Sequence, residues 1–206
     1  FYNVKMFKEL GLTVPTTQTE FMTVCQKIAD AKIDPWIHNF KDAVMGDIEM
    51  RNTVWTRALA AGDKTLFADL MSGARKLTDV PYFLEGLKVW QERMQWHRAD
   101  AMANDQNKAI GLFVAGEGAM LYTGTWNVGD ILSKIPEGTD FEFNFFVAPI
   151  DDDAASAKMN AQVDQCFMVN PKAENIDEAK KFMEFWLTDG AMFWSETTNM
   201  PLVTGA

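Results

Sequence analysis

Residues 116–128 read Gly-Glu-Gly-Ala-Met-Leu-Tyr-Thr-Gly-Thr-Trp-Asn-Val. A small-residue turn, a short apolar run and a tryptophan at an expected helix start predict a strand that ends at a cleft. Gly124 allows an unusual backbone angle or a close approach to a ligand. The flat apolar face of Trp126 suits stacking on the C–H face of a sugar ring. Ordinary core packing is the alternative, because large aromatic side chains are highly buried on average.

Helix and strand signals alternate on both sides of this stretch. The segment Thr17-Gln-Thr-Glu20 fits a capping box, and Pro81 suits the first turn of another helix. Alternating strands and helices predict an α/β fold. We expect helices from residue 17, over 43–61, from 78, over 104–115, up to 134 and from 175, and strands over 33–39, between Gly116 and Trp126, over 141–149 and over 162–169. The apolar run 141–149 predicts a buried strand.

The composition limits the possible partners. The 206 residues are 48% hydrophobic and 23% charged, which is typical of a soluble globular protein. A net charge of −10 argues against nucleic acid and against an anionic membrane surface. No run is long and apolar enough for a membrane span, and the N-terminus lacks a basic-then-apolar signal pattern. The first and last residues predict a fragment, because neither end reads as a natural end of a fold.

Cysteines, histidines and clustered aspartates give no metal or cofactor signature. Cys25 and Cys166 lie in apolar patterns and are expected to be buried free thiols. His38 and His97 have no partner at metal-ligand spacing. The aspartates at 151–153 are interpreted as a solvated turn, because they lack the spaced ligands of a calcium loop. We therefore expect neither a metal nor a cofactor.

Five motifs in order link the chain to a known family. They are Tyr2-Asn3 with Phe7 and Gly11-Leu12, Pro15-Thr-Thr17 with Glu20-Phe21, Phe113-Val-Ala-Gly116-Glu-Gly-Ala119-Met120 followed by Gly124-Thr-Trp126, Ala179-Lys-Lys-Phe182-Met-Glu-Phe185, and Asn199-Met-Pro201-Leu-Val203. In this order the sequence resembles the extracellular solute-binding proteins of ABC importers, in the carbohydrate-binding branch that includes maltose-binding protein. One departure is Gln18, which stands where the family usually has tryptophan.

The resemblance implies a fold of two α/β lobes joined by crossing strands, with the ligand between the lobes. This is the type II periplasmic-binding-protein-like fold. On that basis residues 1–163 correspond to the second lobe without its final helices. Residues 164–206 correspond to a crossing strand and returning helices of the first lobe.

Three residues are candidates for ligand binding. The family places an aromatic residue at the position of Trp126, which implies sugar stacking. Asp42 follows a predicted strand end and can accept hydrogen bonds from sugar hydroxyls or cap the helix that begins at Ala43. Asp164 interrupts an apolar strand, which is costly unless the charge is paired or faces a cleft. A hinge hydrogen bond is the alternative for Asp164. For His38 a structural role is expected.

The resemblance implies a non-catalytic receptor that delivers a sugar or oligosaccharide to the membrane permease of an ABC importer. It also implies a monomer outside the cytoplasm, in the periplasm or tethered as a lipoprotein. A polyamine or another small solute is the alternative ligand, because ammonium groups suit carboxylates and aromatic walls. A sugar-active enzyme that uses Asp42 and Asp164 as paired carboxylates is a further alternative.

Overall fold

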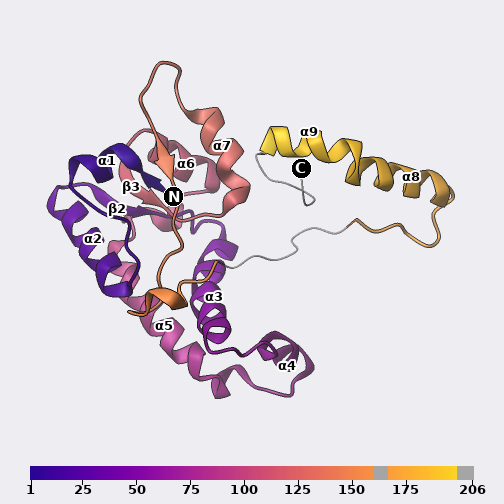
Figure 1. Cartoon of the computed structure of the whole chain (residues 1–206), viewed down its shortest axis with the longest axis horizontal. Helices are drawn as coiled ribbons and strands as arrows, with labels where there is room; N and C mark the ends of the chain where they lie inside the picture. The colour runs from indigo at the N-terminus through magenta and orange to yellow at the C-terminus, as the bar shows by residue number, and fades with distance from the viewer. Residues whose placement is uncertain (160–166, 199–206) are drawn as a thin grey trace. The chain divides into compact units, whose positions relative to one another are not determined.

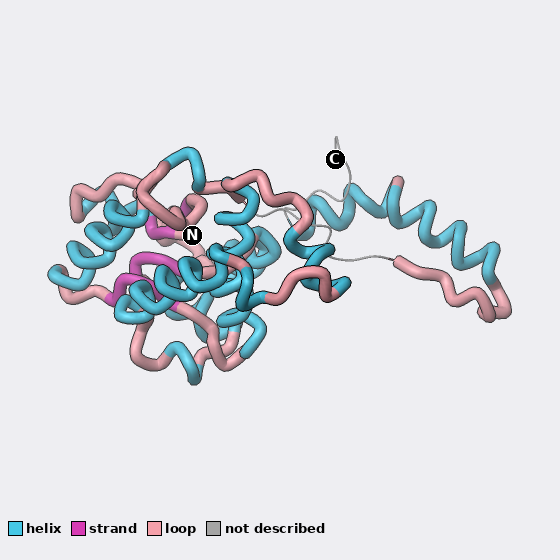
Figure 2. Tube along the Cα trace, turned by 90° about the horizontal axis from the view of Figure 1, so that it is seen from below, coloured by secondary structure: helices cyan, strands magenta, loops and turns pink. Residues whose placement is uncertain are grey.

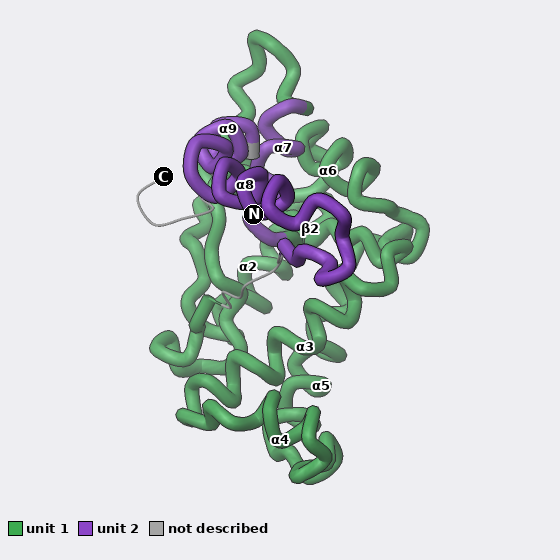
Figure 3. The backbone as a smooth tube through the Cα atoms, turned by 90° about the vertical axis from the view of Figure 1, so that its right-hand side faces the viewer, with its two compact units in different colours: residues 1–123, 134–160 green, residues 124–133, 161–206 purple. Residues whose placement is uncertain are grey.

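The computed structural model describes residues 1–159 and 167–198, which fall into two compact units. Unit 1 comprises Phe1–Thr123 and Lys134–Asn160, and unit 2 comprises Gly124–Ser133 and Ala161–Ala206. Figure 3 shows the two units in different colours. The predicted boundary at residues 163–164 lies outside the described residues and stays a prediction.

Unit 1 contains a four-stranded mixed sheet with the order β2-β3-β1-β4. The strands are β1 (Tyr2–Asn3), β2 (Asp34–Ile37), β3 (Gly118–Leu121) and β4 (Phe143–Asn144). The central pair β2 and β3 is parallel, with Trp36 beside Met120 and Ile37 beside Leu121. The strand β1 is antiparallel to both β3 and β4. The sheet therefore joins the first residues of the chain to strands far along the sequence.

Helices of unit 1 pack on this sheet and extend away from it (Figures 1 and 2). In unit 1 they are α1 (Val4–Glu9), α2 (Gln18–Asp30), α3 (Ala43–Ala60), α4 (Leu66–Ser72), α5 (Pro81–Arg93) and α6 (Gln106–Val114), with short 3₁₀ turns η1 (Leu77–Asp79), η2 (Met94–Trp96), η3 (Ala101–Ala103) and η5 (Ala154–Ser156). Helix α2 contacts β2, and α6 contacts β3. Among the described residues no helix is long and apolar enough to cross a membrane.

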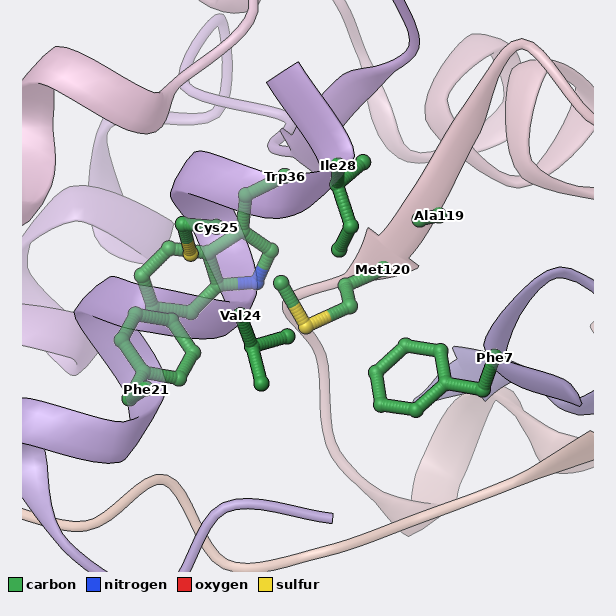
Figure 4. Packing of buried hydrophobic residues seen from close by; sticks show 8 residues of the cluster. All are labelled: Phe7, Phe21, Val24, Cys25, Ile28, Trp36, Ala119 and Met120. Atoms are coloured by element: carbon green, nitrogen blue, oxygen red, sulfur yellow. The ribbon is translucent and has the colours of Figure 1, made fainter. Parts of the chain in front are cut away.

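Helix α2 begins at the predicted capping box and covers the core of unit 1. Thr17 Oγ1 accepts a hydrogen bond from the Glu20 N–H at 3.2 Å, and Glu20 Oε2 accepts one from the Thr17 N–H at 3.3 Å. Its predicted apolar stripe is buried against Trp36 and Met120 (Figure 4). The stripe consists of Phe21, Val24, Cys25 and Ile28. Burial of Phe21, Val24 and Ile28 stabilises the fold by about 1.5–3 kcal/mol for each side chain.

Cys25 is a free, buried thiol, as predicted. Burial raises the pKa of this thiol to about 12, so the nucleophilic thiolate is scarce at neutral pH. Cys166 lies outside the described residues. The sequence interpretation of Cys25 as a small hydrophobic side chain is therefore confirmed.

The long helices α3 and α5 pack against each other at a glycine. The hydroxyl of Thr53 in α3 donates to the carbonyl of Gly86 in α5 at 3.1 Å. A Cβ atom on Gly86 would lie 2.8 Å from both Thr53 Oγ1 and Val54 Cγ2. Both helices begin where the sequence predicts, and Pro81 occupies the first turn of α5. The missing side chain at Gly86 is what allows the close approach of the two helices.

The apolar run 141–149 does not form the buried strand that the sequence predicts. Only Phe143 and Asn144 are in a strand, and the side chain of Phe145 is 57% exposed. The reason is that β4 lies at the edge of the sheet beside a strand of two residues, so only two residues can pair. Aromatic contacts take the place of further backbone hydrogen bonds between strands. The ring of Phe143 packs beside that of Phe1, with ring centroids 5.7 Å apart.

The described part of unit 2 is helical. It contains η4 (Thr125–Asn127), α7 (Val128–Lys134, whose last residue is counted in unit 1), α8 (Ile176–Leu187) and α9 (Asp189–Thr198). Asn175 precedes α8 as predicted, but its side chain makes no capping hydrogen bond. The expected last helix is followed by a further one, α9. No residue of α8 is buried, and Phe182 is 58% exposed. The predicted strand 162–169 begins outside the described residues, and residues 167–169 are not in a strand.

We expect Gly86→Ala to lower the free energy of unfolding by about 1–3 kcal/mol, because the methyl group would overlap Thr53 and Val54. The matched control is Gly111→Ala in α6, where a Cβ would meet nothing within 4 Å. That control should raise stability by roughly 0.5–1 kcal/mol through helix propensity. Urea unfolding of both variants measures the difference, and equal stabilities would contradict the packing argument.

Candidate functional site

Trp126 lies directly after the strand that the sequence predicts. The strand β3 ends at Leu121, and Trp126 occupies the middle of η4, which continues into α7. Its side chain is 46% exposed, so the alternative of a fully buried core residue is wrong. The indole therefore keeps apolar surface accessible for a ligand.

Gly124 supports the indole of Trp126 at very short range. A Cβ atom on Gly124 would lie 2.0 Å from Cζ3 of the Trp126 ring. The backbone of Gly124 is extended, with φ −105° and ψ 178°, so of the two alternatives for this glycine the unusual backbone angle is wrong. Glycine is needed here because only a residue without a side chain allows the ring to lie against the backbone. This contact fixes the orientation of the indole.

Asp42 stands at the start of α3 but does not cap it. It occupies the N-cap position, and its side chain makes no capping hydrogen bond. Instead Oδ2 of Asp42 accepts hydrogen bonds from the backbone N–H of Gln106 at 3.2 Å and from Nδ2 of Asn39 at 3.3 Å. The carboxylate thereby joins the start of α3 to the first turn of α6. It remains partly accessible to solvent.

The three predicted ligand-binding residues belong to different parts of the chain. Asp42 lies in unit 1 and Trp126 in unit 2. Asp164 lies outside the described residues. Their common role in one binding site stays a prediction.

A second polar cluster lies inside unit 1 at His38, Glu49 and His97. One nitrogen of each imidazole and one carboxylate oxygen all lie within 4.8 Å of one another. His38 follows β2, Glu49 lies on α3 and His97 follows η2. The expectation that the histidines have no partner at metal-ligand spacing is therefore wrong. The fold brings together residues whose spacing in the sequence carries no signal.

The donor atoms of this cluster converge without forming hydrogen bonds. Nε2 of His38 lies 3.2 Å from Oε2 of Glu49, and Nε2 of His97 lies 3.6 Å from the same oxygen. Both Nε2 atoms and both Glu49 carboxylate oxygens are buried without a hydrogen-bond partner. The expectation of a structurally satisfied His38 is wrong for its side chain, because Nδ1 also has no partner.

Burial and mutual charge set the protonation of the cluster. Burial lowers the pKa of the His38 imidazole, although the nearby Glu49 carboxylate opposes this shift. Burial would raise the pKa of Glu49, but His38 and His97 outweigh it and lower that pKa well below its ordinary range. Glu49 is consequently an ionised carboxylate in an interior position.

Aromatic rings enclose the two imidazoles. Tyr122 stacks on His38 with ring centroids 5.5 Å apart, and Trp36 meets His38 edge-on at 4.5 Å. Phe40 contacts His38 at 4.6 Å and His97 at 5.0 Å. These rings shield the cluster from water, so the Nε2 atoms of the two imidazoles have the Glu49 carboxylate as their polar neighbour.

The sequence does contain a signal for Glu49. The buried positions Met45, Glu49 and Thr53 recur every four residues along α3, so the carboxylate lies on the stripe that faces the interior. An acidic residue on a buried stripe requires a charged or metal partner. The identity of that partner depends on the fold, because His38 and His97 come from distant segments.

The comparison with protein families defines the class of this chain. Residues 1–193 match the family of bacterial extracellular solute-binding proteins, and the chain belongs to that family. The resemblance seen in the five motifs is therefore confirmed. Members of this family are binding proteins. No curated protein matches the chain.

Solved structures of solute-binding proteins share the fold. The chain is similar to RafE in complex with raffinose, with 21% identity, a TM-score of 0.67 and coverage of 97% of this chain and 52% of that one. RafE from Streptococcus pneumoniae without ligand gives 20% identity, a TM-score of 0.65 and coverage of 100% and 53%. The sugar transporter BL01359 from Bacillus licheniformis in complex with stachyose has 18% sequence identity and a TM-score of 0.60. The match covers 90% of this chain and 48% of that one.

The chain thus spans about half the length of the solute-binding proteins that it matches. The predicted fold class, an α/β fold of the periplasmic-binding-protein type present in part, is confirmed by these likenesses. At sequence identities near 20%, the likeness to these structures establishes the fold of the chain. The identity of its ligand has to be argued from the residues of the site.

We expect Asp42→Ala to lower the free energy of unfolding by about 1.5–3 kcal/mol, since the backbone N–H of Gln106 and the amide of Asn39 lose a charged acceptor. Asp47→Ala is the matched control on the same helix, because Asp47 forms only an exposed ion pair with Arg51. That control should change stability by less than about 0.5 kcal/mol. Thermal and urea unfolding give both values, and a silent Asp42→Ala would contradict the bridging role.

Proposed function

We propose that this chain is part of an extracytoplasmic carbohydrate-binding receptor that delivers a sugar or oligosaccharide to an ABC importer. The observation that carries the proposal is the half-exposed indole of Trp126, held by Gly124 at the end of β3 in a chain of the solute-binding family. A tryptophan face of this kind stacks on the apolar C–H face of a sugar ring. The raffinose and stachyose complexes of proteins with the same fold support a sugar as ligand.

Carboxylates would complement the stacking residue. Asp42 is a partly accessible carboxylate that accepts the hydrogen bonds from Gln106 and Asn39 through Oδ2. An ionised carboxylate forms stronger hydrogen bonds to hydroxyl groups than a neutral acceptor does. We propose Asp42 and Asp164 as the polar ligand-binding residues in addition to Trp126.

The receptor would act without catalysis and without a cofactor. Closure of two lobes around the sugar would exclude water and present a new surface to the membrane permease. The complete receptor would be a monomer, in the periplasm or tethered to the outer face of the membrane as a lipoprotein. A polyamine ligand and a sugar-active enzyme are less well supported, because the ligands named for proteins of this fold are sugars and the family consists of binding proteins.

We expect Trp126→Ala to weaken sugar binding by on the order of 2 kcal/mol or more, the size typical of an anchoring aromatic residue. Gly124→Ala should also weaken binding, because its methyl group would displace the indole. Phe67→Ala is the control, since it removes another exposed aromatic ring. Phe67 lies in α4, which contains none of the proposed ligand-binding residues. Calorimetric titration measures the affinities, and thermal unfolding verifies that the variants fold. Unchanged affinity in Trp126→Ala would refute the stacking role.

A thermal-shift panel of mono- and oligosaccharides and polyamines tests the ligand class. Ligands that bind only the folded protein raise its Tm, by an amount set by the ratio of ligand concentration to Kd. We expect at least one sugar to raise the Tm and polyamines to leave it unchanged. A shift with spermidine alone would replace the sugar by a polyamine, and turnover of labelled oligosaccharides would replace the receptor by an enzyme.

A further inference from the structure

The His38–Glu49–His97 cluster has the donor set of a transition-metal site. Two imidazole nitrogens and one carboxylate oxygen converge, and this combination binds zinc in many proteins. Zinc ligands lie about 2.0–2.2 Å from the metal, which places neighbouring donor atoms of a tetrahedron roughly 3.3–3.6 Å apart. The observed N···O separations of 3.2 and 3.6 Å fit that spacing.

The unsatisfied polar atoms provide an independent argument. The Nε2 atoms of His38 and His97 and both oxygens of Glu49 are buried without hydrogen bonds, although they face one another. Buried polar groups in native proteins are almost always paired. Side chains that are 1–6% exposed and whose ligand atoms lie within 4.8 Å of one another are arranged for a cation between them.

We propose that His38, Glu49 and His97 bind one divalent transition-metal ion of the zinc type, as a structural site inside unit 1. The ion would supply the missing partner of all three donor groups. It would also tie together β2, α3 and the segment after η2, to which the three residues belong.

The surroundings agree with a structural role. The rings of Trp36, Phe40 and Tyr122 surround the imidazoles and keep solvent away. Apolar surroundings of this kind restrict access to the metal. None of the three cluster residues is among the proposed sugar-binding residues, so the site would hold the fold of unit 1 in place and leave direct sugar contact to other groups.

The composition of the chain makes the proposal easy to test. The 206 residues contain two histidines, and both belong to the cluster. Any imidazole that binds a metal ion in these 206 residues is therefore His38 or His97. Among the described residues the thiol of Cys25 is buried with a raised pKa, which argues against it as a competing ligand.

The first experiment adds Zn²⁺ to protein that has been treated with a chelator. We expect binding of one ion per chain and, at a hundredfold excess over Kd, a rise in Tm of about 5–10 °C. The imidazole proton and nitrogen resonances of both histidines should shift on addition of Zn²⁺. Co²⁺ in place of Zn²⁺ should give the visible absorption of a tetrahedral site, and Zn²⁺ should displace it.

Variants distinguish the site from a simple ion pair. Glu49→Gln keeps the shape of the side chain and removes the anionic ligand, and we expect at least about a 100-fold loss of Zn²⁺ affinity, since even outer partners of metal ligands contribute 10–100-fold. Glu142→Gln, at an exposed residue paired with Lys8, is the control and should bind Zn²⁺ like the parent.

Two outcomes would overturn the proposal without depending on whether Glu49→Gln folds. If the unmodified protein binds no stoichiometric Zn²⁺ and the chelator leaves its Tm unchanged, the cluster is a buried ion pair. If Zn²⁺ binds but the two imidazole signals stay in place, the ion sits on surface carboxylates.

Discussion

The burial of the Glu49 carboxylate is the constraint on which unit 1 depends. Taking an ionised carboxylate out of water costs several kcal/mol unless partners compensate it. The groups that face the carboxylate come from two other segments, since His38 follows β2 and His97 follows η2. The interior position of Glu49 is therefore tolerated only when α3 packs in one register against β2 and η2. A hydrophobic residue at this place would fill the space without specifying that register.

Arg93 is the positive counterpart of Glu49 in the same interior. It is 1% exposed, and its guanidinium donates to Oε1 of Gln18 at 2.7 and 3.1 Å and to the carbonyl of Pro149. The guanidinium also lies over the ring of Phe21 at 5.0 Å. Arg93 stands on α5 and Glu49 on α3, so each helix of this closely packed pair places one buried charge in the interior. Opposite charges on the two helices reduce the net charge that the core has to carry.

The sequence predicts those parts of the fold that depend on local chemistry. Thr17 and Glu20 form their capping box within one turn, and Pro81 needs only its own ring to suit a helix start, so both were predictable. The exposure of Trp126 agrees with the cleft position that the family resemblance implies, whereas the residue pattern alone left core packing as an alternative. The short strand β4 was missed, because its length is set by the two-residue partner β1 and not by the apolar residues of 141–149.

The candidate sites show the same division between local and distant causes. The His38–Glu49–His97 cluster was not predicted, because its residues come from separate segments. Their proximity depends on the packing of α5, which precedes His97, against α3, which carries Glu49. The partner of Asp42 was equally hidden, since Gln106 comes from the start of α6. In both cases the residue types were visible in the sequence and their geometry was not.

The buried cluster and the partly accessible Asp42 are connected through the backbone. Asp42 lies between His38 and Glu49 in the sequence, so both ends of its segment are held by the same cluster. Its Oδ2 is also oriented by Gln106 and Asn39. A carboxylate fixed in this way loses little conformational freedom when it binds a ligand, which favours affinity. Rigid interior contacts at His38 and Glu49 thus provide the pre-organisation that the proposed receptor needs at its surface.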